Sequence, residues 1–148
     1  MIREVNTQDA NDMAELLRQL SSSDEASVTE ETVAAIKAKI ADMSQLEHMM
    51  VFGYELDGKI VGTCTLGRVE GLSKGCRPFA IIENVVVLDA IRSRGIGKQL
   101  VRHAMTQAEK WNCYKVILET GTKDEWKLRF YDSCGLTRGG KTAFMKRF

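Results

Sequence analysis

Residues 85–101, with the sequence VVVLDAIRSRGIGKQLV, constrain the fold of this chain more than any other stretch. They predict a buried apolar strand, a short connection, a pair of glycines and then an amphipathic helix. Gly95 and Gly97 leave the backbone bare where that helix begins, and the first N–H groups of a helix have no partner inside it. The helix dipole adds partial positive charge there, so an anion is favoured beside the bare amides. Three basic side chains add full charges around the same point: Arg92, Arg94 and Lys98. The stretch therefore predicts a site that holds a diphosphate without a metal.

Two other phosphate-binding loops are excluded by spacing. A dinucleotide-binding fingerprint needs a third glycine at position 100, where this chain has Leu100. A Walker A loop needs Ser or Thr after Gly-Lys, and here Gln99 follows that pair. A lone Gly-x-Gly also fits a plain turn at a helix start, so the apolar strand before it is what favours an anion site.

The composition is typical of one globular domain, which we place at residues 1–148. Apolar residues make up 44% of the chain and charged residues 28%, and a net charge of +1 gives no general attraction to nucleic acid or to an anionic membrane. Charged residues occur from the third position on and no long apolar run follows, so we expect no signal peptide and no membrane-spanning helix in this sequence. Four cysteines without a C-x-x-C pair, with only two histidines, argue against a zinc site and favour reduced thiols in a cytoplasmic protein.

Hydrophobic periodicity predicts an alternation of strands and helices along the whole chain. In order, these are a strand at 2–5, helices with apolar residues at 10–20 and 33–43, strands at 48–56, 59–67 and 79–88, a helix from 97 to a left-handed cap at Asn112, a strand at 115–120, a helix from 122 to 133, and strands at 136–138 and 142–148. The strand at 79–88, the helix after it and the strand at 115–120 predict one right-handed parallel crossover.

Short motifs mark where these elements begin and turn. The signals are an N-cap at Asn6 or Thr7, capping boxes at Ser27-x-x-Glu30 and Thr122-x-x-Glu125, a hairpin turn at Asp57-Gly58, a helix stop at Gly135, and a link between the last two strands at Gly139-Gly140. The Ser-rich stretch 21–24 separates the first two helices and fits either a surface loop or a lid over a substrate pocket.

Two motifs resemble one enzyme superfamily. Arg92-x-x-Gly95-x-Gly97 is similar to the R/Q-x-x-G-x-G/A signature of the GNAT N-acetyltransferases, and Phe130-Tyr131-x-x-x-Gly135-Leu136 is close to their F-Y-x-x-x-G-F. The element order matches the GNAT fold over essentially the whole chain. That fold is of the α/β (α+β) class, with a mixed central sheet of about seven strands and helices on both faces. Segments at 82–87, 112–116 and 145–148 look most like the glucosamine-6-phosphate N-acetyltransferase branch.

The resemblance implies acetyl-CoA as co-substrate, with no metal. Diphosphate oxygens would sit on the amides of residues 94–99 and pantetheine would lie along the strand at 85–88, with a backbone N–H near Val87 polarising the thioester carbonyl. The residues implied in cofactor binding are Val85, Val86, Val87, Arg92, Arg94, Gly95, Ile96, Gly97, Lys98, Gln99, Lys127 and Tyr131. Lys127 stands where that branch tends to have Asn.

The same resemblance suggests two catalytic residues. Tyr131 would give a proton to the leaving thiolate, and Glu83 would take one from the acceptor amine, directly or through water, with Glu119 as second choice. Tyr131 also fits a core aromatic, and Glu83 also fits a strand-end carboxylate paired with a cation. Candidate acceptor contacts are Asn84, where the branch tends to have Asp, Glu119, Arg68 and Arg77, although a solvated basic loop explains the two arginines equally well.

The sequence therefore predicts an N-acetyltransferase that acts on a small primary amine, with an amino sugar phosphate as one candidate. A protein N-terminus or lysine is the alternative acceptor, and a non-catalytic acyl-CoA-binding module is the alternative class. A module that only binds the cofactor would not need Tyr131 at the sulfur. We also expect a homodimer that pairs through the apolar stretch at 143–145, as many domains of this superfamily pair through C-terminal strands.

Overall fold

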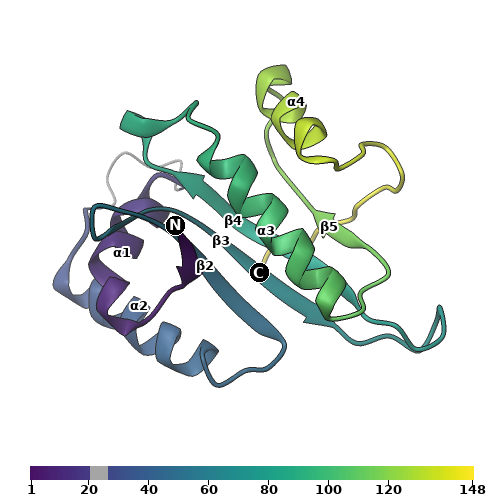
Figure 1. Cartoon of the computed structure of the whole chain (residues 1–148), viewed down its shortest axis with the longest axis horizontal. Helices are drawn as coiled ribbons and strands as arrows, with labels where there is room; N and C mark the ends of the chain where they lie inside the picture. The colour runs from purple at the N-terminus through teal and green to yellow at the C-terminus, as the bar shows by residue number, and fades with distance from the viewer. Residues whose placement is uncertain (21–26) are drawn as a thin grey trace.

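A computed structural model describes residues 1–20 and 27–148 and contains one mixed sheet flanked by helices (Figure 1). The strands within the described residues are β1 (Ile2–Glu4), β2 (Met49–Leu56), β3 (Lys59–Val69), β4 (Phe79–Val87) and β5 (Val116–Leu118). The helices are α1 (Ala10–Arg18), α2 (Glu30–Met43), α3 (Ile96–Lys110) and α4 (Glu125–Cys134), with short 3-10 turns at η1 (Thr7–Asp9) and η2 (Asp89–Ile91). The strands lie in chain order; β1 to β4 are antiparallel, and β5 is parallel to β4.

The hairpin of β2 and β3 forms as the sequence predicts. Asp57 has a φ of 51° and Gly58 a φ of 78°, the pair of left-handed residues that a type I′ turn requires. The predicted crossover is confirmed as well, because β4 and β5 are parallel and α3 joins them. Asn112 has a φ of 58° just beyond α3, and Gly135 a φ of 100° just beyond α4, so both predicted helix stops are confirmed.

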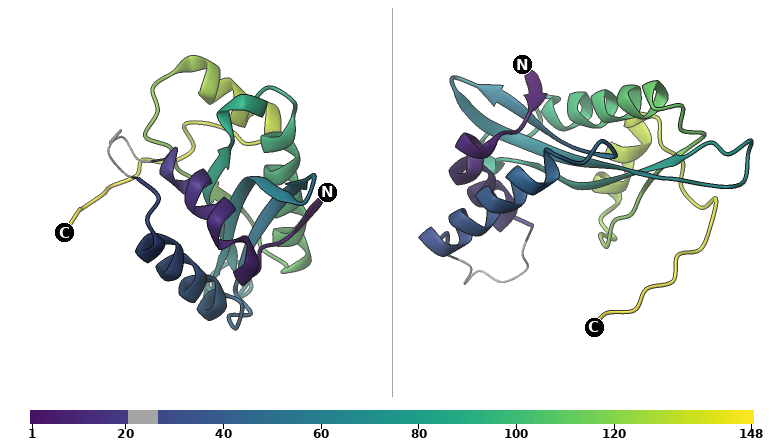
Figure 2. Two further views of the ribbon diagram at one scale, coloured as in Figure 1. Left: turned by 90° about the vertical axis from the view of Figure 1, so that its left-hand side faces the viewer. Right: turned by 90° about the horizontal axis from the view of Figure 1, so that it is seen from below.

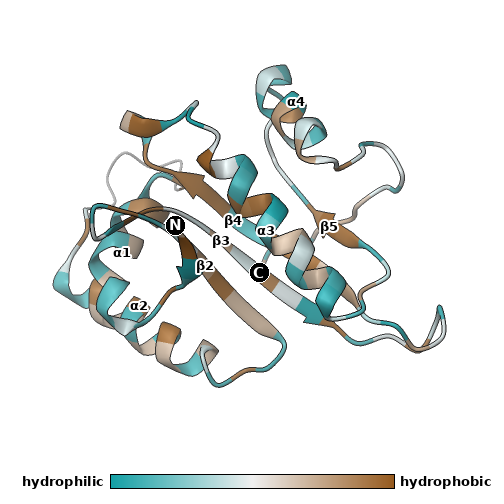
Figure 3. Ribbon diagram, viewed as in Figure 1, coloured by the Kyte–Doolittle hydropathy of each residue, from teal (hydrophilic) through white to brown (hydrophobic). Residues whose placement is uncertain are grey.

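Helices cover both faces of the sheet, with α3 on one face and α1 and α2 on the other (Figure 2). Each face has its own apolar core. On the α3 face Leu66 and Ile82 pack against Leu100, and on the opposite face Leu16 and Ile40 lie in a smaller cluster. Both clusters include residues of β3 and β4, so these two strands are covered on both sides, and β4 is drawn mostly in brown, as a hydrophobic strand, in Figure 3.

A bulge interrupts β4 directly after Glu83, where Asn84 and Val85 lie opposite Cys64 of β3. Thr65 pairs with Glu83 and Thr63 with Val86, so two residues of β4 face a single residue of β3. Asn84 takes a φ of 54°, a left-handed value that asparagine tolerates better than most side chains. A bulge of this kind bends the strand and shifts its inward-facing set by one residue. Accordingly Ile82 packs on the α3 face, whereas the buried side chain after the bulge, Val86, packs on the opposite one.

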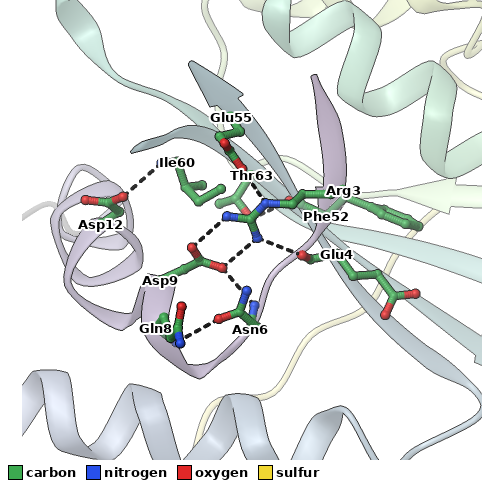
Figure 4. Close-up of polar contacts among 10 residues, drawn as sticks. All are labelled: Arg3, Glu4, Asn6, Gln8, Asp9, Asp12, Phe52, Glu55, Ile60 and Thr63. Carbon is green, nitrogen blue, oxygen red and sulfur yellow. Dashed lines mark hydrogen bonds and ion pairs between the residues drawn. The ribbon is translucent and has the colours of Figure 1, made fainter. Parts of the chain in front are cut away.

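The first strand is joined to its neighbours by a cluster of ion pairs (Figure 4). The guanidinium of Arg3 donates two hydrogen bonds of 2.8 Å to the carboxylate of Asp9 and another to Glu55 of β2. Asp9 also accepts the amide of Asn6 at 2.8 Å, which completes a capping box with Asn6 as N-cap. The cluster therefore holds the helical segment that begins with η1 against β1 and β2.

The predicted sheet differs from the structure in two respects. The described part of the chain forms five strands and not seven, because residues 136–148 do not pair with the sheet. Leu136 still packs against the core on the α3 face, but the apolar side chains near the end of the chain lie in solvent, and Phe144 is 95% exposed. Arg138 instead bonds to Glu125 and Asp132 of α4. The predicted strand at 115–120 shortens to Val116–Leu118, since only those residues pair with β4.

The two predicted capping boxes are also replaced. Thr29, not Ser27, caps α2 by accepting the amide of Thr32 at 3.1 Å, and α4 begins after Asp124 without a side-chain cap. The Ser-rich stretch 21–24 lies outside the described residues. Within the described residues, no helix has the length and apolarity that crossing a membrane needs.

Candidate active site

The two glycines at the start of α3 do different things. Gly95 is the N-cap residue with a φ of 77°, and a Cβ placed there would meet nothing within 4 Å, so its peptide faces open space. A Cβ on Gly97 would lie 3.1 Å from the ring of Phe130 and 3.6 Å from Val87. The prediction that both glycines leave room for an anion thus applies to Gly95, whereas Gly97 allows α4 and β4 to approach α3.

A run of free amides lies beside this open space. Among the described residues, the backbone N–H groups of residues 94–98 make no hydrogen bond, whereas the amide of Gln99 already donates to the carbonyl of Gly95 at 3.0 Å. Neither Arg94 nor Lys98 forms an ion pair within the described residues. Unpaired amides at a helix N-terminus, with two cations alongside, fit the diphosphate of a nucleotide carrier.

Arg92, the first residue of the signature, is tied to the protein. Its guanidinium donates to the carbonyl of Val87 at 3.2 Å and is ion-paired with Asp89 at 2.5 Å. These contacts fix the connection between β4 and α3. Arg92 therefore positions the loop, and the charges left for an anion are those of Arg94 and Lys98.

The edge of β4 that faces β5 is open beyond Ile82. The two strands pair only from Ala80 to Ile82, opposite Val116 to Leu118, and then separate. Glu83, Val86 and Val87 keep their partners on β3, and no described strand pairs with the other edge of residues 83–87. That edge is therefore free to pair with an extended chain. Val85 and Val87 contact the α3 side and Val86 is buried on the other, so these residues offer backbone groups and not side chains.

Tyr131 lies on α4 in a partly buried setting. Its ring meets that of Phe130 edge to face, with centroids 5.0 Å apart. Burial raises the pKa of the Tyr131 phenol above its ordinary value, and the charges of Cys134 and Glu83 raise it further. The hydroxyl accordingly stays protonated at neutral pH, as a proton donor must. Lys127, on the same helix, is 3.0 Å from the Asp124 carboxylate and lies over the ring of Trp126.

A cavity of about 460 Å³ lies between the helices α1 and α2 and the strands β2 to β4. Glu83 and Asn84, at the bulge of β4, form part of its wall, and Thr65 of β3 and Lys39 of α2 add further polar groups. Sequence reasoning did not identify Thr65 or Lys39 as site residues. The available signal was the polar pair in the middle of an apolar strand, which marks the bulge.

The other predicted acceptor contacts lie elsewhere. Arg68 is ion-paired with Glu70 at 2.6 Å and lies over the ring of Trp111 at the end of α3. Arg77 donates to the backbone carbonyls of Asn112 and Cys113, both at 3.1 Å. Neither arginine lines the cavity. Glu119 follows the last residue of β5, level with Glu83, because Leu118 pairs with Ile82.

Comparisons with known proteins agree with this arrangement. Residues 13–136 match the model of the acetyltransferase (GNAT) family. The chain is 35% identical over 100 residues to the glucosamine 6-phosphate N-acetyltransferase of Trypanosoma brucei brucei, covering 66% of this chain and 66% of that protein. It is 30% identical over 123 residues to the Arabidopsis thaliana glucosamine 6-phosphate N-acetyltransferase, covering 83% of this chain and 79% of that protein.

A solved structure described as a putative acetyltransferase from Agrobacterium tumefaciens str. C58 superposes with a TM-score of 0.88 at 39% identity, covering 100% of this chain and 99% of that one. Together with the free amides at the start of α3, the open edge of β4 and the phenol of Tyr131, these matches establish that the chain belongs to the acetyltransferase (GNAT) family and is an acetyl-CoA-dependent N-acetyltransferase.

Proposed function

We propose that the protein transfers an acetyl group directly to the primary amine of a small molecule held in the cavity beneath α1 and α2. The observation that carries this proposal is the position of Glu83, which lines the cavity and whose charge also acts on Tyr131. A base for the acceptor thus lies in the cavity wall, within electrostatic reach of the phenol that would serve as acid for the leaving group.

The residues of the α3 loop and of the β4 edge hold the donor in this proposal. Amides 94–98, with Arg94 and Lys98, bind the diphosphate, and the free edge of residues 83–87 takes the pantetheine arm. A backbone N–H near Val87 polarises the carbonyl that is attacked. Lys127 remains a proposed contact to the cofactor. In this structure it is ion-paired with Asp124 at the start of α4, and its side chain is partly exposed.

Bound acetyl-CoA supplies the acetyl group as a thioester, and the new C–N bond to the acceptor nitrogen forms as the C–S bond breaks. The acceptor arrives as an ammonium, so it must lose a proton before its lone pair can attack. Glu83 accepts that proton directly or through water, with Glu119 as the second candidate. Tyr131 gives its phenolic proton to the departing sulfur, and the second proton that the nitrogen loses on becoming an amide restores the phenol. One ammonium proton is released to solvent overall, and the products are an amide and a thiol.

The experiment must distinguish the proposed function from two alternatives, a peptide acceptor and a module that only binds acyl-CoA. A peptide N-terminus or lysine needs an open groove, whereas the volume of the cavity, about 460 Å³, is that of a small-molecule site. A module that only binds acyl-CoA would show no turnover with any amine. The printed names of the relatives make glucosamine 6-phosphate one acceptor to be tested.

The first test is calorimetric titration of the protein with acetyl-CoA, followed by an assay of thiol release over a panel of amines. Replacing both Arg94 and Lys98 by alanine should weaken acetyl-CoA binding about tenfold or more, because two charge-assisted contacts to phosphate are lost. Lys110→Ala, at the other end of α3, is the matched control and should bind as the parent does. Saturable binding of acetyl-CoA without release of thiol from any amine would show that the protein only binds the cofactor, and would reject the transferase. Absence of acetyl-CoA binding would contradict the proposal altogether.

We also propose that two copies associate through the C-terminal segment. Phe144 is 95% and Met145 75% exposed, and a second copy would cover apolar surface that this chain leaves in water. A cytoplasmic location fits the four free cysteines, since thiols stay reduced in that compartment.

A further inference from the structure

The wall of the acceptor cavity is mostly hydrophobic. Its volume of about 460 Å³ is typical of a small-molecule site. Much of its surface comes from aliphatic and thioether side chains of the two covering helices and β2: Met13, Leu17, Ile36, Ile40, Met43 and Val51. The polar groups gather on the side of the β4 bulge, where Glu83, Asn84 and Thr65 lie.

An amino sugar phosphate matches this wall poorly. Its hydroxyls would lie against methionine and aliphatic side chains, and each polar group buried without a partner weakens binding. Its phosphate would need converging arginines or lysines. Among the described residues that line the cavity, Lys39 is the one cation; its ammonium lies 3.8 Å from Asp42 and its side chain is 70% exposed.

We infer that the acceptor is a primary amine on an apolar body, an aliphatic or aromatic chain without a second charge. This inference rests on the proposed function and names its substrate class. The body of the acceptor packs against the apolar side chains of α1, α2 and β2, and its ammonium points to Glu83 on the polar side of the cavity. Three methionines of the wall, Met13, Met43 and Met49, adapt their shape and make favourable sulfur contacts with aromatic rings.

The test compares kcat/KM for 2-phenylethylamine and hexylamine with that for glucosamine 6-phosphate and for a lysine-containing peptide. The apolar amines should be preferred by at least about tenfold, as expected when a polar acceptor loses its partners. Ile36→Arg places a charge in the cavity wall and should lower kcat/KM for the apolar amines about 10- to 100-fold by raising KM. Ala38→Arg adds the same charge to an exposed position of α2 outside the wall and should change little.

Calorimetry with acetyl-CoA separates this inference from the proposed function. Circular dichroism establishes that each variant is folded, and Ile36→Ala, which removes apolar surface without a charge, gives a second, milder loss if the arginine is not tolerated. An equal or better rate with the sugar phosphate or the peptide would overturn the inference. So would acetyl-CoA binding with no turnover of either apolar amine, or equal rates for the parent and the folded Ile36 variants. A protein that does not bind acetyl-CoA would instead refute the proposed function.

Discussion

At the scale of single residues, Tyr131 shows how the position of a side chain changes its ionisation. A phenol that leaves water resists ionisation, since the charged form loses more hydration than the neutral one. Burial does this to Tyr131, and the nearby carboxylate of Glu83 adds to the effect. The motif around Phe130 and Tyr131 indicated a tyrosine at this place, whose phenol is protonated at neutral pH even in water. Burial of the side chain raises its pKa further.

We predict that Tyr131→Phe lowers kcat roughly 100-fold, since general acid catalysis contributes at least that much, while the Kd for acetyl-CoA stays unchanged. The variant keeps the ring that meets Phe130 and removes only the hydroxyl. In the parent enzyme the raised pKa keeps the phenol protonated beyond its ordinary value of about 10, so no tyrosine-linked loss of kcat should be seen below about pH 10. Steady-state kinetics across pH tests both statements, and an unchanged kcat would remove Tyr131 from the mechanism.

The two glycines at the start of α3 differ in what surrounds them. Gly95 and Gly97 look alike in the sequence, yet one supplies a left-handed cap beside open space and the other makes room for Phe130. The pattern predicted the loop correctly but gave both glycines the same role. Which atoms lie across from a glycine depends on segments that are distant in sequence, here on α4.

At the scale of elements, the site depends on how closely α3 lies on the sheet. Gly62 of β3 sits under the start of this helix, where a Cβ would come 3.1 Å from both Ile96 and Leu100 and 3.3 Å from the carbonyl of Val86. A larger residue would push the helix and its free amides away from the edge of β4. The donor site is therefore built by contact between elements and not by the loop alone.

We predict that Gly62→Ala lowers the free energy of unfolding by about 1–3 kcal/mol, the usual cost of overpacking a core, and weakens acetyl-CoA binding several-fold. Gly67→Ala on the same strand is the matched control, because a Cβ there meets nothing within 4 Å. Urea unfolding and calorimetry measure the two effects. Equal stability of the Gly62 variant and the parent would show that α3 adjusts freely, which the close contacts argue against.

At the scale of the whole molecule, one sheet separates two working faces. The α3 side carries the free amides and cations to which we assign the anionic donor, and the α1 and α2 side carries the apolar cavity that we assign to the acceptor. The bulge after Glu83 and the separation of β4 from β5 connect the two, since both occur just after Ile82. Reaction between donor and acceptor is possible only where the sheet opens.

The C-terminal segment supports a prediction at this scale. Removing residues 142–148 should convert a dimer into a monomer of slightly less than the 16.6 kDa of the full chain, with a little-changed Tm, because these side chains are exposed in the single copy. Replacing Phe144 and Met145 by serine keeps the chain length and should have the same effect. Light scattering gives the mass, and a full-length protein that is monomeric at all concentrations would reject the dimer.

The sequence by itself determined most elements and their order, since hydrophobic period, the Asp57-Gly58 turn and the helix stops at Asn112 and Gly135 are local properties. It also indicated the donor loop, because a strand, a glycine turn and a helix start are adjacent in the chain. Only the tertiary structure decided that the last thirteen residues add no strand, so that the described sheet has five. It also decided that Arg68 packs on Trp111 and Arg77 bonds to the backbone, so neither faces the cavity. Finally, it placed apolar side chains of α1 and α2 in the same cavity wall as Glu83. Those outcomes depend on which distant segments compete for the same surface, and no local pattern records that competition.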